Sequence, residues 1–327
     1  MSSPRKLKFG LAINEALHQL METDDRVMLL GQGVKSPWYV GSTANGLLDR
    51  FGERRVIDTP VSENAMTGAA VGAGLAGMRP VIVHPRVDFM LYAFDPIINQ
   101  AANWAFMNGA RNPASVVFWG IVNRGGEQAA QHSQALHALF AHIPGLKVVM
   151  PASPADAKGL MVAAVRDPNP VVFIDDRWLY RQEEPVDEAI YETPIGEARV
   201  VREGADVTVV ALSSAVLVAH EAAGNLAKTG VDVELIDLRT VKPLDSDAVL
   251  ASVKKTGRAV VVDPGWRSFG VSAEIIASVC ERGLDLLKTA PSRVTLPDTP
   301  APANRELEKA FYLNAEKIEA AVRAQLG

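Results

Sequence analysis

Short apolar, β-branched runs alternate with helix-length amphipathic segments along most of the sequence, and this alternation constrains the fold more than any other feature. Parallel strands need a crossover of a dozen or more residues between them, and that crossover is usually a helix. The runs are continuously apolar, as expected for strands that helices cover on both faces. The sequence therefore predicts an α/β protein built from doubly wound, open sheets.

The periodicity also predicts where the elements lie. In the first part of the chain, apolar runs predict strands and helical spacing predicts helices. These strands are 27–31, 81–83, 115–118, 147–150 and 171–174, and the helices are 10–21, 63–76, 92–108 and 154–165. A second alternation has strands at 207–211, 231–238 and 259–262, and helices at 215–228, 245–254, 269–281 and from 314 onward.

The length of 327 residues is more than one hydrophobic core usually holds, which favours two domains. Between residues 180 and 200 the alternation stops, and an acidic stretch with two prolines replaces it. Such stretches are typical of interdomain linkers. We therefore predict a first domain over 1–185, an acidic linker over 186–200 and a smaller domain over 201–327.

Composition excludes several classes of protein. A net charge of −5 argues against nucleic-acid binding, which needs a basic surface. No apolar stretch approaches the roughly 20 residues that a membrane helix requires. Cys280 is the single cysteine, so the chain has neither an internal disulfide nor a cysteine-based metal cluster. We expect a cytoplasmic protein.

Two common nucleotide motifs and one hydrolase motif were considered. Gly72, Gly74 and Gly77 match the spacing of the dinucleotide fingerprint, but that fingerprint must lie at the turn from a strand into a helix. Here the glycines lie late in a predicted helix, where small residues favour close packing at an interface. The sequence also contains no P-loop and no Gly-x-Ser-x-Gly elbow, so NTP hydrolysis and serine-hydrolase chemistry have no support.

Glu63 has two interpretations from its local sequence. The segment Asp58-Thr-Pro-Val-Ser-Glu63 fits a strand-to-helix turn, in which Ser62 caps the helix and Glu63 complements the helix dipole. Alternatively, Glu63 is a functional carboxylate at the carboxyl end of a parallel strand, where open α/β sheets bind ligands. The spacing alone leaves both interpretations open.

His132 lies in a long polar loop, Asn123 to Gln134, that contains two glycines and follows a predicted strand. Loops at this place often carry catalytic residues, although a loop histidine bonded to backbone is the simple alternative. His137 and His142 follow at spacings of five, which is not the i, i+4 pairing of a helical metal site. A zinc site is therefore not expected here.

A series of motifs in constant order then resembles a known family. The motifs are Asp58-Thr-Pro-Val-Ser-Glu63, Val71-Gly-Ala-Gly, Gly77-Met-Arg-Pro80, Ala130-Gln-His-Ser-Gln134, Pro144-Gly-Leu-Lys-Val-Val149, Asp156-Ala-Lys-Gly-Leu160, Arg166-Asp-Pro-Asn-Pro-Val171, Leu238-Arg-Thr-Val-Lys-Pro243, Asp263-Pro-Gly-Trp-Arg-Ser-Phe-Gly270 and Asp298-Thr-Pro300. Over essentially its whole length the chain resembles the β subunit of the E1 component of 2-oxo acid dehydrogenase complexes, closest to the pyruvate type. These are transketolase-like thiamine diphosphate enzymes. The resemblance implies an N-terminal pyrimidine-binding domain and a transketolase C-terminal-like domain.

The resemblance also implies roles for site residues. Glu63 corresponds to the carboxylate that hydrogen-bonds N1′ of the cofactor's aminopyrimidine and promotes its imino tautomer, a role that needs a strong, proton-sharing acceptor. Phe89 corresponds to the aromatic residue that packs against the aminopyrimidine ring. His132 corresponds to an active-site histidine that handles protons and contacts the acyl acceptor. Tyr92 and Gln32 fall at cofactor-binding positions that usually carry Gln and Glu.

Further partners and ions follow from the same resemblance. The Gly-Asp-Gly motif that holds the cofactor diphosphate through Mg²⁺ is absent from these 327 residues. In the family that motif lies on a separate α subunit, so the resemblance implies an α2β2 heterotetramer. A 2-oxo acid such as pyruvate would be the substrate, and a lipoyl-E2 would receive the acyl group. Asp167 and Asn169 fall in a segment that holds a structural monovalent cation, such as K⁺, in some relatives, although Asp-Pro-Asn-Pro also suits a turn.

Several departures from the family leave other functions open. Gln32 and Tyr92 differ from the usual residues, Trp119 replaces a common Arg, and Val83-His-Pro-Arg-Val87 replaces Phe-Met-Thr-Phe. A split transketolase or carboligase, which passes the carbanion or acyl unit to a non-lipoyl acceptor, is the alternative enzyme. A scaffold subunit with a degenerate site is the non-enzymatic alternative, and the retained Glu63, Phe89 and His132 together argue against it.

Overall fold

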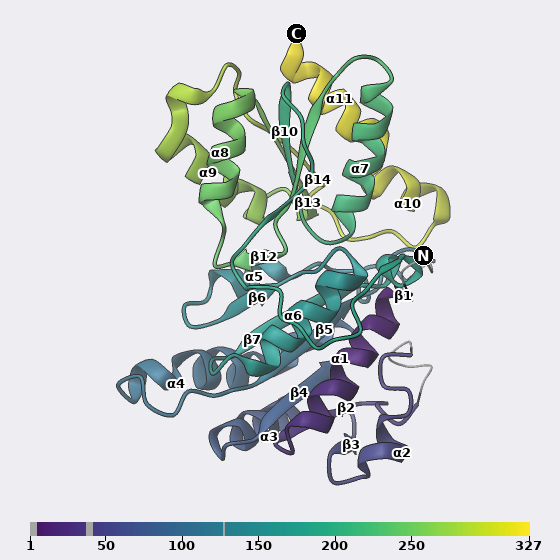
Figure 1. Ribbon diagram of the computed structural model, residues 1–327, viewed down its shortest axis with the longest axis vertical. Coiled ribbons are helices and arrows are strands. Elements are labelled where there is room, and N and C mark those ends of the chain that lie inside the picture. The colour runs from purple at the N-terminus through teal and green to yellow at the C-terminus, as the bar shows by residue number, and fades with distance from the viewer. Residues whose placement is uncertain (1–4, 37–41, 127) are drawn as a thin grey trace. The chain divides into compact units, whose positions relative to one another are not determined.

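The computed structural model describes residues 5–36, 42–126 and 128–327, and it divides into two units. Unit 1 comprises Met1–Asn123 and Leu139–Ile195, whereas unit 2 comprises Arg124–Ala138 and Gly196–Gly327. The loop that carries His132 therefore belongs to unit 2, although the sequence on both sides of it belongs to unit 1. Each unit contains its own sheet between layers of helices (Figure 1).

Unit 1 is built around a parallel sheet with the strand order β6-β7-β5-β4-β2-β3. Its strands are β2 (Val27–Gly31), β3 (Val56–Asp58), β4 (Arg79–His84), β5 (Val117–Val122), β6 (Lys147–Val149) and β7 (Val171–Asp176). Strands β5 and β7 are buried along their whole length, as their unbroken apolar runs predict. A separate antiparallel pair joins β1 (Lys6–Lys8) to β8 (Glu183–Pro185).

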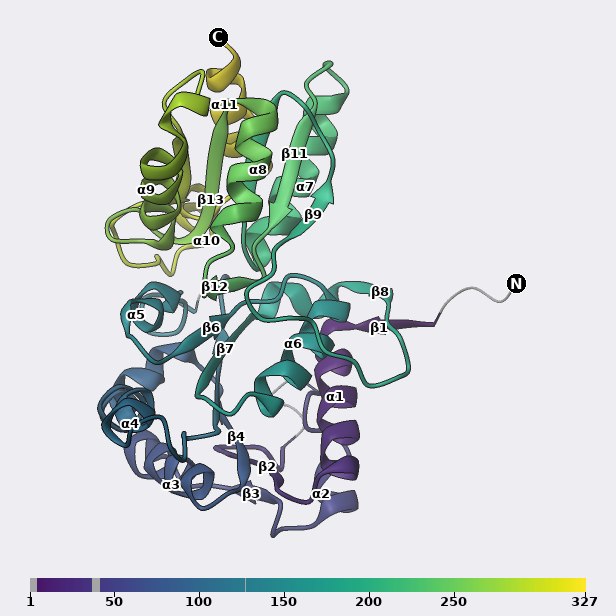
Figure 2. The ribbon, with the colours of Figure 1, turned by 60° about the vertical axis from the view of Figure 1, so that its left-hand side comes forward.

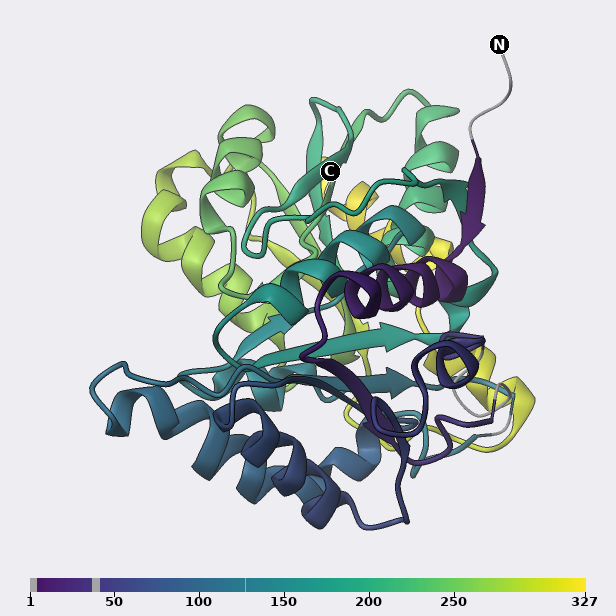
Figure 3. The same cartoon turned by 60° about the horizontal axis from the view of Figure 1, so that its bottom comes forward.

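Helices cover both faces of this sheet. Helices α1 and α6 lie along one face, and α3 and α4 lie along the other (Figures 2 and 3). The helical segments of unit 1 are α1 (Phe9–Thr23), α2 (Leu47–Phe51), α3 (Glu63–Leu75), η1 (Val87–Ala93), η2 (Asp95–Ala101), α4 (Ala102–Met107), α5 (His137–His142), α6 (Pro154–Arg166) and η3 (Arg177–Arg181). The first two residues of α5 belong to unit 2. The prediction of a doubly wound parallel sheet is confirmed.

The predicted helix over 92–108 is wrong in type over much of its length. The chain forms a 3₁₀ helix over Val87–Ala93, then a π-helical stretch over Asp95–Ala101, and only then α-helix. Pro96 lacks an amide hydrogen and cannot donate the bond that a continuous α-helix would need there. Strand β5 also starts two residues later than predicted and extends to Val122, because the apolar run continues through Trp119.

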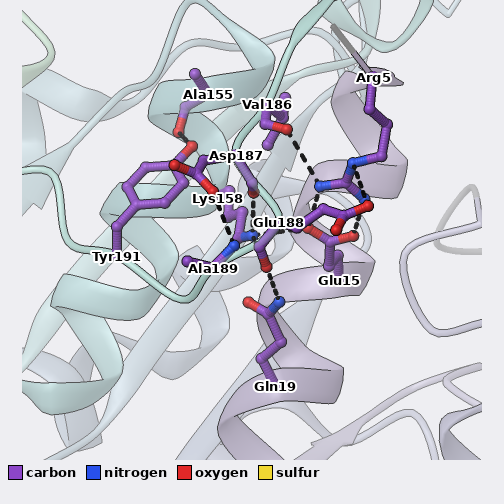
Figure 4. Close-up of polar contacts among 10 residues, drawn as sticks. All are labelled: Arg5, Glu15, Gln19, Ala155, Lys158, Val186, Asp187, Glu188, Ala189 and Tyr191. Carbon is purple, nitrogen blue, oxygen red and sulfur yellow. Dashed lines mark hydrogen bonds and ion pairs between the residues drawn. The ribbon is translucent and has the colours of Figure 1, made fainter. Parts of the chain in front are cut away.

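A buried lysine attaches the segment after β8 to the helices of unit 1 (Figure 4). The side chain of Lys158 on α6 is completely buried, and its ammonium group lies 2.7 Å from Oε1 of Glu15 on α1. It also donates hydrogen bonds to the carbonyl oxygens of Asp187 and Glu188, at 2.6 and 3.2 Å. Arg5 forms a second ion pair with Glu15, at 2.5 Å. The first residues of the predicted linker are therefore bound to unit 1.

Unit 2 contains a five-stranded sheet with the order β14-β13-β10-β11-β9. Strand β9 is antiparallel to β11, and the other pairs are parallel. Helices α8 and α9 lie on one face of this sheet, and α7 and α11 lie on the other (Figure 1). The elements are β9 (Arg199–Arg202), β10 (Val207–Ala211), α7 (Ser214–Ala227), β11 (Val233–Asp237), β12 (Thr240–Lys242), α8 (Ser246–Thr256), β13 (Ala259–Trp266), α9 (Val271–Gly283), η4 (Leu284–Leu286), β14 (Ser292–Leu296), α10 (Arg305–Phe311) and α11 (Ala315–Leu326).

The two-domain α/β architecture is as predicted. The boundaries 1–185, 186–200 and 201–327 stay a prediction. No helix in the described ranges is long and apolar enough to cross a membrane.

Candidate functional site

Three neighbouring strands of unit 1 bring candidate residues to one edge of the sheet. Strand β2 lies between β3 and β4, and all three run parallel. Gln32 directly follows β2, Glu63 follows the short turn after β3, and Phe89 follows β4. The carboxyl ends of parallel strands meet at one edge of a sheet, and α/β proteins bind ligands at that edge. Each of these three residues comes after the carboxyl end of one strand, so all three start from this edge.

Glu63 is the first residue of α3 and is half-buried. Its carboxylate forms no hydrogen bond or ion pair with any residue that the structure describes. Ser62 occupies the N-cap position, but its side chain makes no capping hydrogen bond, contrary to the simple cap interpretation. The free acceptor at a helix N-terminus, where the dipole favours negative charge, is therefore available to a ligand.

Hydrogen bonds across the strand ends fix the turn before α3. Oδ1 of Asp58 accepts a hydrogen bond of 2.7 Å from the amide of Gly33, and the amide of Thr59 donates to the carbonyl of Gly31 at 3.1 Å. The side-chain amide of Asn64 reaches the carbonyl of Tyr92 at 3.4 Å. These contacts link the start of α3 to β2 and to η1, so the elements that bear Glu63 and Phe89 are held together.

Phe89 and Tyr92 both lie on the 3₁₀ helix η1, but in different environments. Phe89 is half-buried, whereas the side chain of Tyr92 is 74% exposed. An aromatic ring that is partly covered and partly open suits stacking against a planar ligand ring. The ring of Tyr92 is available to a ligand or to another protein surface.

A buried polar pair lies behind this site. Nε2 of His84, at the end of β4, lies 3.2 Å from Oγ1 of Thr67, one helical turn after Glu63. Burial lowers the pKa of His84 to about 3, so the imidazole is neutral at physiological pH. The only signal for this pair in the sequence is the unusual His-Pro-Arg segment. It connects α3 to β4 without contributing charge.

His132 lies in the loop between β5 and α5 and belongs to unit 2. The residue is half-buried, and its amide donates to the carbonyl of Ala129 at 3.5 Å. Gly125 and Gly126 have φ values of 66° and 62°, which other residues rarely adopt. The loop thus has a defined turn ahead of His132, and glycine suits that turn.

Asp167 and Asn169 form a turn at the end of α6. Oδ1 of Asp167 accepts a hydrogen bond of 2.9 Å from the amide of Asn169, and Lys147 pairs with the other carboxylate oxygen. The main-chain oxygen of Asp167 accepts a hydrogen bond of 2.9 Å from the hydroxyl of Ser115. This arrangement is the Asx turn that the sequence left open. The monovalent cation stays a prediction.

Neither a metal cluster nor a dinucleotide loop is present in the described part of the chain. No group of three or more His, Cys, Asp or Glu residues there could hold a metal ion. Gly72 and Gly74 lie inside α3 rather than at a strand-to-helix turn. The rejection of the dinucleotide fingerprint is confirmed.

Comparison with protein-family models identifies both domains. Residues 5–183 match the model described as "Transketolase, pyrimidine binding domain", and residues 196–318 match "Transketolase, C-terminal domain". A solved structure described as a split gene transketolase, an inactive β4 tetramer, has a TM-score of 0.80 and 22% identity over 98% of each chain, which shows the shared fold. Fold and domains together define a transketolase-like protein.

Similarity to curated proteins assigns the chain to a narrower family within this class. It is 44% identical to the acetoin:2,6-dichlorophenolindophenol oxidoreductase subunit β of Cupriavidus necator, over 98% of this chain and 97% of the relative. It is 42% identical to the pyruvate dehydrogenase E1 component subunit β of Rickettsia felis, over 94% of this chain and 95% of that protein. The corresponding acetoin subunit of Bacillus subtilis is 37% identical, over 99% and 98%. The chain belongs to the transketolase-like family of dehydrogenase E1 β subunits, as the motif series predicts.

Proposed function

We propose that this chain is the β subunit of a two-subunit, thiamine diphosphate-dependent E1 enzyme that decarboxylates a 2-oxo acid such as pyruvate. A lipoyl-E2 would receive the acyl group. The observation that carries the proposal is the carboxylate of Glu63 at the start of α3, which has no partner among the residues that the structure describes. Asn64, the next residue, contacts the helix η1 that bears Phe89. Full-length relatives with E1 β names support the same function.

The residues at this edge of unit 1 fit the aminopyrimidine of thiamine diphosphate. Glu63 would accept and share a proton at N1′, because an unpaired carboxylate is the strong acceptor that this exchange needs. Phe89 would pack on the ring, while Gln32 and Tyr92 would line the same region. When bound, the cofactor supplies the electron sink that decarboxylation of a 2-oxo acid requires. His132 would move protons at the substrate and contact the acyl acceptor.

The proposal includes a separate α subunit. The sequence has no Gly-Asp-Gly motif, so another chain must hold Mg²⁺ and the cofactor diphosphate. We propose an α2β2 heterotetramer in the cytoplasm that is active only when both subunits are present. For the segment at Asp167 we propose a structural K⁺, which thermal unfolding in KCl and in LiCl would test.

A second candidate follows from the relatives named for acetoin and from the departures of this sequence from the pyruvate-type pattern. The relative from Cupriavidus necator is named as an acetoin oxidoreductase subunit and aligns over nearly the full chain. Trp119 and Tyr92 differ from the usual pyruvate-type residues. A hydroxyketone donor, or a free carbonyl acceptor in place of lipoamide, would therefore be the alternative chemistry.

The deciding experiment uses the purified complex with its α subunit. Reduction of 2,6-dichlorophenolindophenol is measured with pyruvate, longer 2-oxo acids and acetoin, each with and without thiamine diphosphate and Mg²⁺. Turnover of a 2-oxo acid that also acylates a lipoyl domain supports the first proposal. Turnover of acetoin alone, or of a free aldehyde acceptor without lipoyl acylation, would support the second. Full activity of Glu63→Gln would contradict both.

A further inference from the structure

The loop that carries His132 is attached at both ends to two consecutive residues of β13. Near its start, Nη1 of Arg124 donates a hydrogen bond of 3.1 Å to the carbonyl of Pro264. After its end, Nε2 of His137 lies 2.9 Å from Oδ1 of Asp263. All of these residues belong to unit 2. The contacts therefore close the loop on one dipeptide at the carboxyl end of a buried strand.

The pair of His137 and Asp263 is completely buried, with both side chains 0% exposed. Burial alone would raise the pKa of Asp263, but the charge and hydrogen bond of His137 and the amides of Ser272 and Gly265 hold it below its usual range. Those amides donate at 3.0 and 2.8 Å. An ionised carboxylate can only accept, so Nε2 of His137 carries the hydrogen and donates it.

Gly265 shows how closely this pair is packed. A Cβ atom added at Gly265 would lie 3.0 Å from Cε1 of His137 and 3.1 Å from Oδ1 of Asp263. Both neighbours are fixed by their mutual hydrogen bond, so neither can move without weakening it. A side chain at position 265 would therefore push against both members of the pair.

We propose that His137 and Asp263 form a positioning pair for His132, which lies five residues before His137 in the loop that leads into α5. The inference rests on the proposed catalytic role of His132. Moving a loop away from its native position costs little free energy. A catalytic group misplaced by about 1 Å, however, can slow a reaction by about a hundredfold. A buried, charge-assisted hydrogen bond at the end of the loop limits that shift. His137 itself touches no substrate in this proposal.

The test compares two variants in the complex with the α subunit. His137→Leu removes the donor, whereas His137→Gln keeps an N–H group that can reach Asp263. We expect His137→Leu to lower kcat by about tenfold to a hundredfold with little change in the KM for the substrate, and His137→Gln to recover most of the loss. Thr208→Val is the matched control, because it removes a buried hydroxyl of β10 that lies 2.7 Å from Ser252 in the same unit. Equal activity of the Leu and Gln variants would overturn the proposal.

A double-mutant cycle separates positioning from general stability. If His137 acts through His132, then His132→Ala combined with His137→Leu should be no slower than His132→Ala alone. Multiplying losses would contradict the proposal.

Hydrogen exchange gives a readout that does not depend on activity. Amides of residues 128–136 should exchange at least tenfold faster in His137→Leu than in the wild type, and should be unchanged in Thr208→Val. Unchanged exchange in His137→Leu would overturn the anchoring argument, even in a complex that turns over none of the substrates. If exchange is faster in His137→Leu but the wild-type complex turns over none of the substrates, the anchoring argument holds. That result would count against the proposed function instead.

Discussion

The indole Nε1 of Trp119 donates a hydrogen bond of 3.2 Å to Oδ2 of Asp175, within the buried sheet of unit 1. The same carboxylate oxygen accepts a hydrogen bond of 2.9 Å from the hydroxyl of Tyr180. Trp119 on β5 pairs with Phe173 on the adjacent strand β7, and Asp175 lies two residues further along β7. The buried carboxyl group of Asp175 is thus paired with two neutral donors. Burial raises the pKa of this carboxyl group, and the two hydrogen bonds offset that shift only in part.

Asp175→Asn should remove a pH dependence of stability. Burial raises the pKa of Asp175 to about 7, although the hydrogen bond from Tyr180 and the charge of Arg177 lower it. The folded state therefore holds a proton that the unfolded state loses above about pH 4, and stability falls as pH rises to about 7. As pH rises through this window, the free energy of unfolding of the variant should increase relative to that of the wild type by about 1.4 kcal/mol per pH unit. The total difference should reach roughly 4 kcal/mol. Urea unfolding from pH 4.5 to 8 measures this gain. A difference between the two proteins that does not vary with pH would refute the assignment.

His84→Gln should show the opposite pH dependence. Burial lowers the pKa of His84 to about 3 in the folded state. Its imidazole therefore stays neutral in the folded protein at pH values where the unfolded chain binds a proton, below about pH 6.5. Stability from this group is present above that pH and is lost as pH falls. Between pH 6.5 and 4, the free energy of unfolding of the variant should therefore rise by about 3 kcal/mol relative to that of the wild type. The Gln side chain can still contact Thr67. Because the His84 and Asp175 contributions oppose each other from pH 4 to 6.5, each variant should uncover the slope that the other group masks.

Two glycines of α3 should respond in opposite directions to the same substitution. A Cβ at Gly74 would lie 2.8 Å from the carbonyl oxygen of Ser115, whereas nothing lies within 4 Å of one at Gly72. Gly74→Ala should destabilise the isolated chain by about 1–3 kcal/mol through overpacking. Gly72→Ala should stabilise it by up to about 1 kcal/mol, because alanine favours helix. Thermal unfolding of the two variants, side by side, provides the measurement. Loss of stability in both would mean that the face of α3 at Gly72 is covered.

The sequence predicted some elements to the residue and missed others for physical reasons. Strands Val27–Gly31 and Val207–Ala211 match their apolar runs, since these runs are bounded by turn residues. Strand β3 has three residues, Val56–Asp58, and so short a run has no usable periodicity. The sequence therefore placed Glu63 at a strand end only through its Asp-Thr-Pro turn.

The candidate site was predicted in part. The Asp58–Glu63 motif predicts Glu63 as a site residue and the family resemblance adds Phe89, whereas neither indicates the buried partner of His137. His137 was considered only for zinc, because its partner Asp263 lies 126 residues further along the chain. A carboxylate directly after the apolar run Ala259–Val262 was the available signal, and local spacing cannot reveal such a long-range pair.

Lys158→Met should destabilise unit 1 and release the segment after β8. Methionine keeps much of the volume but leaves Glu15 with only Arg5 and removes the donor to the carbonyls of Asp187 and Glu188. Breaking a buried ion pair by removing one partner typically costs about 3–5 kcal/mol, and the remaining Arg5 places the expected loss near the lower value. Urea unfolding should show that loss, and amides 186–191 should exchange faster.

Arg166→Gln is the control from the same helix. Its ion pair with Glu192, 2.8 Å long, is largely exposed, so its loss should cost less than about 1 kcal/mol. Equal losses in the two variants would show that burial of Lys158 adds nothing to this anchor.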